Sequence, residues 1–389
     1  MSVTTPKGFR ANGIACGIKA SGAMDLSLVA TSTGEPAVAV ATFTQNRSAA
    51  APVRVSKSHL AASKNSAYAV ILNSGNANAA NGEKGMSDAI DMTRFVAQEL
   101  GVPEETVLVC STGLIGIPLD TTPIRLGVKD LVEGLSSDQD GANRSARAIM
   151  TTDTVPKTAT HLGLGFSIGS IAKGAAMIAP NMATMLSVIT TDAKLTPEIA
   201  QVALSKAVDG SFNRLVIDGC TSTNDTVILL SSQVGVEPRP SVFSEALAQV
   251  CRSLADQMAM DAEGAHKLVR IRVFGALDEE HALILAKKAA SSQLVQCSFY
   301  GSDPYWGRIA SEFGSAGAEF DLDRLSVSYG GIEVARGGIS VDFDPVALGK
   351  VMAKREILIE CDLGLGSGEA MVTTTDLSPE YIAENMRTS

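Results

Sequence analysis

Aromatic residues are scarce in this chain: they make up 4% of its 389 residues, and there is a single tryptophan. Alanine, aliphatic residues and methionine must therefore fill most of the core, and a hydrophobic content of 45% is typical of a globular protein. Histidine is also scarce, with four residues, and none stands in H-x-x-x-H or H-E-x-x-H spacing. Because that spacing places two imidazoles on one helix face, we expect no metal site of the metallohydrolase type.

Paired cysteines are missing as well. The chain has six cysteines, all far apart in the sequence, at positions 16, 110, 220, 251, 297 and 361. Without a C-x-x-C pair, we predict neither a disulfide framework nor a zinc site. Several of the six have apolar neighbours, and we expect them to be reduced residues of the core.

Excess positive charge is absent, since the net charge is -10. Nucleic acids and anionic membrane surfaces attract basic proteins, so we expect neither as a partner. No apolar stretch approaches the roughly 20 residues of a membrane span, and residues 1–19 lack the apolar centre of a signal peptide. We expect a cytoplasmic protein.

Short apolar runs alternate with helical stretches along the chain. Glycines 330 and 331 separate two short β-like runs and predict a hairpin. Predicted strands are 37–44, 67–73, 107–110, 226–231 and 269–274, and predicted helices are 86–100, 196 onward, 244–258 and 281–290. The mixture indicates an α+β or layered α/β architecture. A boundary near Gly275, where the pattern restarts with a helix and then strands, divides the chain into a main domain at 1–275 and a second domain at 276–389.

Threonine, serine and glycine gather in short polar clusters. A glycine beside a hydroxyl residue lets the backbone approach a ligand closely, and an oxyanion needs N–H donors fixed in that way. The glycine-rich segment 364–368 lacks the lysine and the spacing of nucleotide-binding loops, so we predict a turn there. The clusters lie at 73–78, 110–113, 150–154, 173–186 and 220–225.

A threonine hydroxyl becomes a good nucleophile when a base lies beside it. An N-terminal threonine carries such a base in its own α-amine, whose reference pKa is about 7.7–8.0. Thr184 lies within the cluster 173–186, so its amine would be released only by cutting the chain between Ala183 and Thr184. This chemistry is feasible but does not by itself single out Thr184 among the threonines.

The segment 173–186, Lys-Gly-Ala-Ala-Met-Ile-Ala-Pro-Asn-Met-Ala-Thr-Met-Leu, closely resembles the self-cleavage motif of the glutamate N-acetyltransferases, also called ornithine acetyltransferases. The resemblance runs nearly from end to end. Further matching motifs lie, in order, at 17–22, 73–78, 110–116, 148–154, 222–226, 261–264 and 301–304.

The resemblance implies a role for each matched residue. Thr184 would be the nucleophile and the first residue of a β chain, 184–389, released from an α chain, 1–183. The hydroxyl of Thr112 and the N–H of Gly113 would form the oxyanion hole. Lys173 could hold a carboxylate and Glu263 an ammonium group. The implied substrate contacts are Thr151, Lys173, Thr184, Glu263, Asn385 and Ser389.

The resemblance also implies the reaction and the assembly. N2-acetylornithine would acetylate Thr184 and leave as ornithine, and glutamate would then take the acetyl group, within the cyclic arginine pathway. No metal or redox cofactor would be needed, although acetyl-CoA is an alternative co-substrate. The fold would be a layered α/β sandwich that resembles N-terminal-nucleophile hydrolases in its layering but differs in topology, followed by a smaller α+β C-terminal domain, 276–389. Family members assemble as heterotetramers of two α and two β chains.

Three features depart from the family pattern: Gln296 replaces a lysine, Tyr305 replaces an asparagine, and the tail 384–389 is one residue short and lacks a tyrosine. They raise the alternative of a different substrate choice. Other readings are a bifunctional enzyme that also uses acetyl-CoA, an aminopeptidase-like hydrolase, an acetyltransferase of secondary metabolism, and an uncleaved binding protein.

Overall fold

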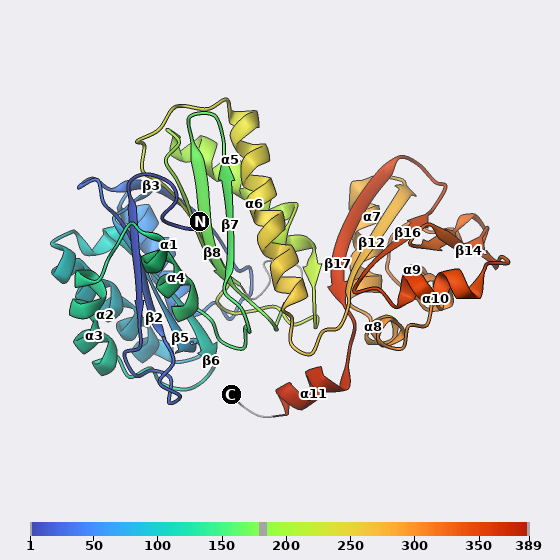
Figure 1. The fold of residues 1–389 in the computed structure, drawn as a ribbon, viewed down its shortest axis with the longest axis horizontal. Coiled ribbons are helices and arrows are strands. Elements are labelled where there is room, and N and C mark those ends of the chain that lie inside the picture. Colours follow the sequence, from blue (N-terminus) through green and yellow to red (C-terminus); the bar gives the residue numbers. More distant parts are fainter. Residues whose placement is uncertain (1, 179–184, 387–389) are drawn as a thin grey trace.

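The computed structural model describes residues 2–178 and 185–386, in three β-sheets with covering helices (Figure 1). The first sheet has the strand order β1-β2-β5-β6, and only its β5–β6 pair is parallel. Its strands are β1 (Phe9–Ile14), β2 (Leu26–Thr31), β5 (Ala69–Asn76) and β6 (Val107–Leu114). Helices α1 (Ala51–Ala62), α2 (Gly82–Leu100) and α3 (Thr122–Glu133) cover its outer face, and α4 (Gln139–Ala148) packs against β1 and β2.

The second sheet has the order β4-β3-β11-β9-β8-β7, and only its β11–β9 pair is parallel. Its strands are β4 (Ser66–Ala67), β3 (Ala37–Phe43), β11 (Thr226–Ser231), β9 (Leu186–Thr191), β8 (Ser167–Lys173) and β7 (Lys157–Leu162). Helices α5 (Pro197–Asp209) and α6 (Pro240–Met260) pack on its outer face.

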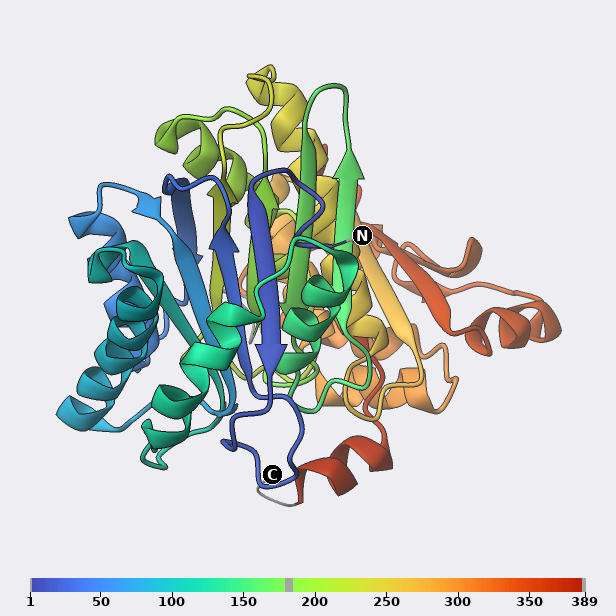
Figure 2. The same cartoon turned by 60° about the vertical axis from the view of Figure 1, so that its left-hand side comes forward.

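The two sheets pack face to face, which gives the order helix, sheet, sheet, helix. One apolar cluster joins Val70 and Leu72 of the first sheet to Ile171 and Val188 of the second. The central strands of the second sheet are covered on both faces, and strands of this kind have continuous apolar sequences because neither side meets water. The predicted layered α/β sandwich is therefore confirmed (Figure 2).

A third sheet forms the C-terminal part, in the order β10-β17-β12-β16-β13-β14-β15. Its strands are β10 (Leu215–Val216), β17 (Gly368–Thr375), β12 (Leu268–Ala276), β16 (Glu356–Asp362), β13 (Ser326–Tyr329), β14 (Ile332–Arg336) and β15 (Ile339–Ser340). Its helices are α7 (Glu279–Ala290), α8 (Gln293–Tyr300), α9 (Trp306–Gly314) and α10 (Pro345–Met352). The last helix, α11 (Pro379–Asn385), lies beneath the sandwich in both ribbon views (Figures 1 and 2).

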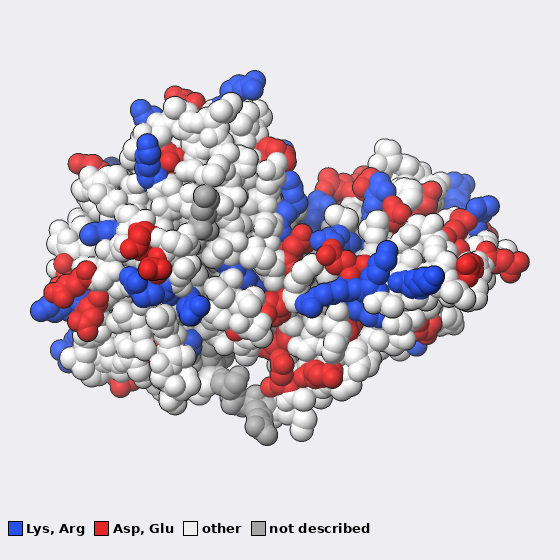
Figure 3. All heavy atoms as spheres, viewed as in Figure 1, with Lys and Arg blue, Asp and Glu red and all other residues white. Residues whose placement is uncertain are grey.

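The predicted domain division at 275 falls at the end of β12. All the β12 pairs lie in the third sheet, with β16 and β17. Figure 3 shows a notch between the sandwich and this C-terminal part. Arg270 of β12 forms an ion pair with Asp256 of α6. The sheet itself begins before the predicted division, and the extent of the domains stays a prediction.

The local signals for helix ends and turns are confirmed. Helix α2 ends at Gly101, which has a left-handed φ of +68°. Thr196 caps α5 by accepting a hydrogen bond from the Ile199 N–H. The hairpin between β13 and β14 turns at Gly330 and Gly331, both with positive φ.

The prediction for the cysteines is partly wrong. All six are free thiols, and Cys110, Cys251 and Cys361 are buried as expected. Cys220 and Cys297 are exposed: the first lies in a loop, and the second lies in α8 but is not among its buried residues.

Candidate active site

A cavity of about 840 Å³ opens where the two sheets of the sandwich meet α11. Its walls come from the ends of β5, β6 and β8, from loops at 18–21, 151–152 and 218–220, and from α11. Six of the predicted site residues line this one cavity: Thr112, Gly113, Thr151, Lys173, Glu263 and Asn385. The remaining three, Ala183, Thr184 and Ser389, lie outside the described residues.

The end of β6 is shaped by a contact that only glycine permits. Gly113 has a φ of +132°, and a Cβ there would lie 2.3 Å from the carbonyl carbon of Gly75. The β5–β6 register shifts at this point, which redirects the two strand ends. Thr112 is nearly buried, and its hydroxyl makes no hydrogen bond to any described residue, so it can donate to a ligand.

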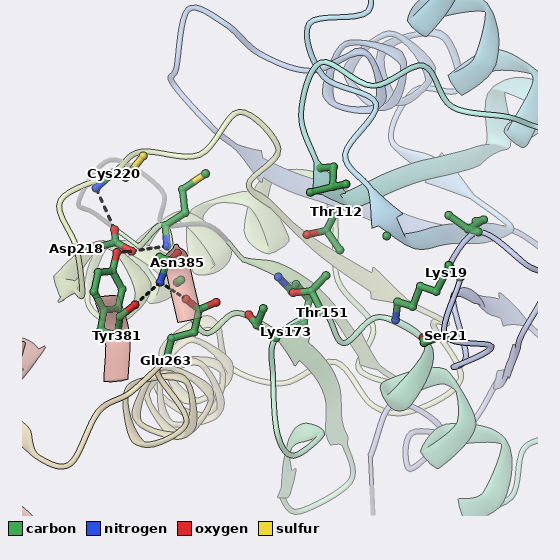
Figure 4. Close-up of a pocket in the computed structure, with 18 residues that line it drawn as sticks. Lys19, Ser21, Thr112, Thr151, Lys173, Asp218, Cys220, Glu263, Tyr381 and Asn385 are labelled. Carbon is green, nitrogen blue, oxygen red and sulfur yellow. Dashed lines mark hydrogen bonds between the residues drawn. The ribbon is translucent and has the colours of Figure 1, made fainter. Parts of the chain in front are cut away.

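Lys173 ends β8 at the centre of the cavity, near Thr112 and Thr151 (Figure 4). It is 4% exposed, and no carboxylate oxygen of the described residues lies within ion-pair distance of its Nζ. Burial lowers the pKa of Lys173, whereas Asp153, Asp225 and Glu263 oppose that change. An ammonium group without a protein partner can bind a substrate carboxylate.

Asp153 connects two walls of the cavity. Its carboxylate accepts hydrogen bonds from the Thr151 N–H (3.0 Å), the Gly174 N–H (2.8 Å) and Lys157 Nζ (2.5 Å). Burial alone would raise the pKa of Asp153, but the ammonium groups of Lys173 and Lys157 and the N–H of Gly174 lower it to about 2. The carboxylate is therefore an anion throughout the neutral range.

The opposite end of the cavity is acidic (Figure 4). Glu263 follows α6 and accepts a hydrogen bond from Asn385 Nδ2 at 2.7 Å. Asp218 accepts from the Tyr381 hydroxyl at 3.3 Å and from the N–H groups of Met177 and Ile178. Burial raises the pKa of Asp218, although these donors partly oppose the change. A ligand with a carboxylate and an ammonium group can span the cavity from Lys173 to the acidic end.

The strand that follows the predicted cut is anchored beside this cavity. Lys173 pairs with Leu186 in the β8–β9 register, and the Met185 N–H donates to Asp225 Oδ1 at 2.9 Å. Burial raises the pKa of Asp225 well above its ordinary value. Residue 185 is thus held within the layer that also carries Lys173.

The sequence profile of the ArgJ family matches residues 10–388 of this chain. The chain belongs to the ArgJ family. The arginine biosynthesis bifunctional protein ArgJ of Thermobifida fusca is 44% identical over 386 residues, which cover 99% of each chain. Its counterpart of the same name in Streptomyces coelicolor is also 44% identical, over 387 residues and 99% of each chain. A crystal structure of ornithine acetyltransferase complexed with ornithine, from Mycobacterium tuberculosis, is 42% identical and covers 46% of this chain and 94% of that one, with a TM-score of 0.44.

Two of the departures from the family pattern lie away from the cavity. Gln296 is buried in the C-terminal part, where its Nε2 donates to Ile217 O, Ala290 O and Thr374 Oγ1. Tyr305 is 56% exposed and stacks near Arg308. Neither side chain lines the cavity.

Several lining residues had no predicted role. Lys19 lies in the matched motif 17–22, and its Nζ donates to the carbonyls of Met24 and Met150. The buried Asp25 fixes this loop by accepting the backbone N–H groups of residues 16–19. The motif match at 17–22 was the only sequence signal for this wall, and it did not say what the residues do.

A serine pattern typical of α/β-hydrolases, Gly-Phe-Ser-Ile-Gly at 165–169, does not form a nucleophile elbow. Such an elbow joins a strand to a helix, whereas Ser167 is the first residue of β8. The Ser167 hydroxyl donates to Asp192 Oδ2 at 3.0 Å, and Ser167 does not line the cavity.

A membrane span was not expected. Over residues 2–178 and 185–386, no helix is both long enough and apolar enough to cross a bilayer.

Proposed function

We propose that this ArgJ-family chain transfers an acetyl group from N2-acetylornithine to glutamate through an ester on Thr184, after cutting itself between Ala183 and Thr184. Family membership places the chain in arginine biosynthesis. One observation carries the site assignment: residues from six of the matched motifs line a single cavity, with a buried cation at its centre and carboxylates at one end.

The charges of the cavity match those of the proposed donor. N2-acetylornithine has an α-carboxylate and a side-chain ammonium group. Lys173 would bind the carboxylate and Glu263 the ammonium, while Asn385 holds the Glu263 carboxylate in place at 2.7 Å. This orientation would present the acetyl-amide group, which lies next to the α-carboxylate, on the Lys173 side.

The acetyl transfer proceeds in two steps, first to Thr184 and then to glutamate. The Thr184 α-amine takes the hydroxyl proton, the Thr184 oxygen bonds to the acetyl carbon, and the amide bond breaks as the ornithine nitrogen receives that proton. Thr112 Oγ1–H and Gly113 N–H would donate to the oxygen that becomes negative in the tetrahedral intermediate. The amino group of glutamate then attacks the ester carbon and gives a proton to the α-amine. The ester C–O bond breaks, the Thr184 oxygen takes that proton, and N-acetylglutamate leaves.

The intact mass of the denatured protein tests this proposal. We expect two pieces, residues 1–183 and 184–389, and after incubation with N2-acetylornithine alone the second piece should gain the mass of one acetyl group. Added glutamate should remove it. A single uncut chain, stable at neutral pH, would contradict the mechanism and favour the binding-protein reading, and release of free acetate without glutamate would favour a hydrolase.

Acetyl-CoA is the second candidate donor, supported by the word "bifunctional" in the names of the relatives. N-acetylglutamate formed from acetyl-CoA in the absence of N2-acetylornithine would establish it. We also propose a cytoplasmic heterotetramer of two α and two β pieces, which a native mass measurement would test.

A further inference from the structure

We propose that Asp153 is a positioning residue for acyl transfer: its buried carboxylate fixes the backbone on two walls of the cavity and keeps Lys173 in the ammonium form that binds a substrate carboxylate. This inference deepens the proposed function and rests on it, since it takes Lys173 as the carboxylate-binding group.

The first support is geometric. The Asp153 side chain is fully buried and does not line the cavity, so it acts through its neighbours. Its Oδ2 accepts from the N–H of Thr151, which lines one wall. Its Oδ1 accepts from the N–H of Gly174, the residue that follows Lys173 on another wall. One carboxylate therefore sets the relative position of two predicted substrate contacts.

The second support is the charge around Lys173. The described charged groups that face its ammonium are the carboxylates of Asp153, Asp225 and Glu263 and the ammonium groups of Lys157 and Lys19. Among the carboxylates, Asp153 opposes the effect of burial most. Burial favours the neutral form of Asp225, and Glu263 lies at the end that would bind an ammonium group. Asp153 is thus the anion that stabilises the charge of Lys173 when substrate is absent.

The third support is that Asp153 leaves the Lys173 protons free. Asp153 and Lys173 form no ion pair at 4.0 Å or less, so the attraction acts through space and takes up none of the three N–H donors of Lys173. Lys157 forms the direct ion pairs instead, with Asp153 at 2.5 Å and with Asp261 at 2.6 Å. Asp261 is the C-cap residue of α6 and lies two residues before Glu263, so the same buried network reaches the acidic wall.

Asp153→Asn is the direct test, with Asp261→Asn as the matched control. Both remove one carboxylate partner of Lys157, but only Asp153 faces Lys173. We expect D153N to raise KM for N2-acetylornithine about ten- to a hundredfold, the range for lost hydrogen bonds to charged groups, with a smaller change in kcat. D261N should leave KM much closer to that of the unmodified protein.

The pH profile separates an electrostatic role from a purely structural one. Lys173 binds a carboxylate only below its pKa, so kcat/KM should fall on the alkaline side. Losing the Asp153 charge lowers that pKa, and the alkaline limb of D153N should move to lower pH by about one unit or more. Lys157→Met removes a cation that lowers the Lys173 pKa, so its alkaline limb should move the opposite way.

The proposal would be overturned if the alkaline fall of kcat/KM moved by the same amount in D153N and D261N. It would also be overturned if that fall did not move in D153N. If D153N fails to fold or to be cut, the direction of the shift in K157M decides alone, and a limb that does not move to higher pH overturns it. The unmodified protein is assayed first: if it does not transfer acetyl, the proposed function fails, whereas normal transfer with unmoved limbs rejects the role of Asp153 alone.

Discussion

At the residue scale, Lys173 and Glu263 are both nearly buried, yet they form no ion pair with each other. If the two side chains formed an ion pair with each other, the charges of a zwitterionic ligand would add little favourable binding free energy. Here Glu263 is held by Asn385, and Lys173 makes no hydrogen bond or ion pair to any described residue. Their separation makes the cavity suited to a molecule that carries both charges, such as an ornithine derivative.

Thr112→Ala tests the oxyanion hole. Removing one preorganised donor should lower kcat by about 10²–10³-fold, since the developing charge then loses one of its hydrogen bonds. Thr112→Ser keeps the hydroxyl and should retain most of the activity. A steady-state assay with N2-acetylornithine and glutamate measures both variants, and full activity of Thr112→Ala would remove this role.

At the element scale, the sequence predicted what depends on local rules. Glycines at 101, 330 and 331 marked a helix end and a hairpin because their backbone conformations suit glycine. Long-range contacts could not be predicted: Lys157 and Asp261 meet across 104 positions. Cys220 was expected in the core, but it is exposed in a loop that borders the cavity. Neighbours in the sequence do not show which loop borders a cavity, because that too depends on long-range contacts. The site residues were found through the resemblance, because no local rule distinguishes Thr184 or Lys173 from other residues of their type.

Gly113→Ala tests the contact between the ends of β5 and β6. The added Cβ would lie 2.3 Å from the Gly75 carbonyl carbon, at a φ that alanine rarely adopts. Backbone strain alone costs about 1–3 kcal/mol, and the clash should add to it. We expect a lower denaturation midpoint and loss of acetyl transfer.

Gly116→Ala is the matched control for this variant. Gly116 also has a positive φ, of +77°, but a Cβ there would meet nothing within 4 Å. The Gly116→Ala variant should therefore lose only the stability that corresponds to backbone strain at a positive φ. Equal midpoints for the two variants would show that the approach of Gly113 to Gly75 is unimportant.

At the scale of the whole molecule, the second sheet is built from both sides of the proposed cut. Strands β3, β4, β7 and β8 precede it, and β9 and β11 follow it. In the sheet, β9 and β11 lie between β8 and β3, with six register pairs on each side. Separating the pieces would break the central pairs of this sheet and expose the apolar layers on both of its faces. Cutting the peptide bond therefore need not separate the two pieces.

Thr184→Ala tests this arrangement together with the cut. Without the hydroxyl, the chain should stay whole and transfer no acetyl group, while Thr184→Ser should still be cut. The cut protein and the Thr184→Ala variant should have the same native mass, because the interleaved strands hold the pieces together. Only denaturant should reveal the pieces 1–183 and 184–389 in the cut form. A cleaved Thr184→Ala protein would contradict the assignment of the nucleophile, and pieces that part under native conditions would contradict the role given to the second sheet.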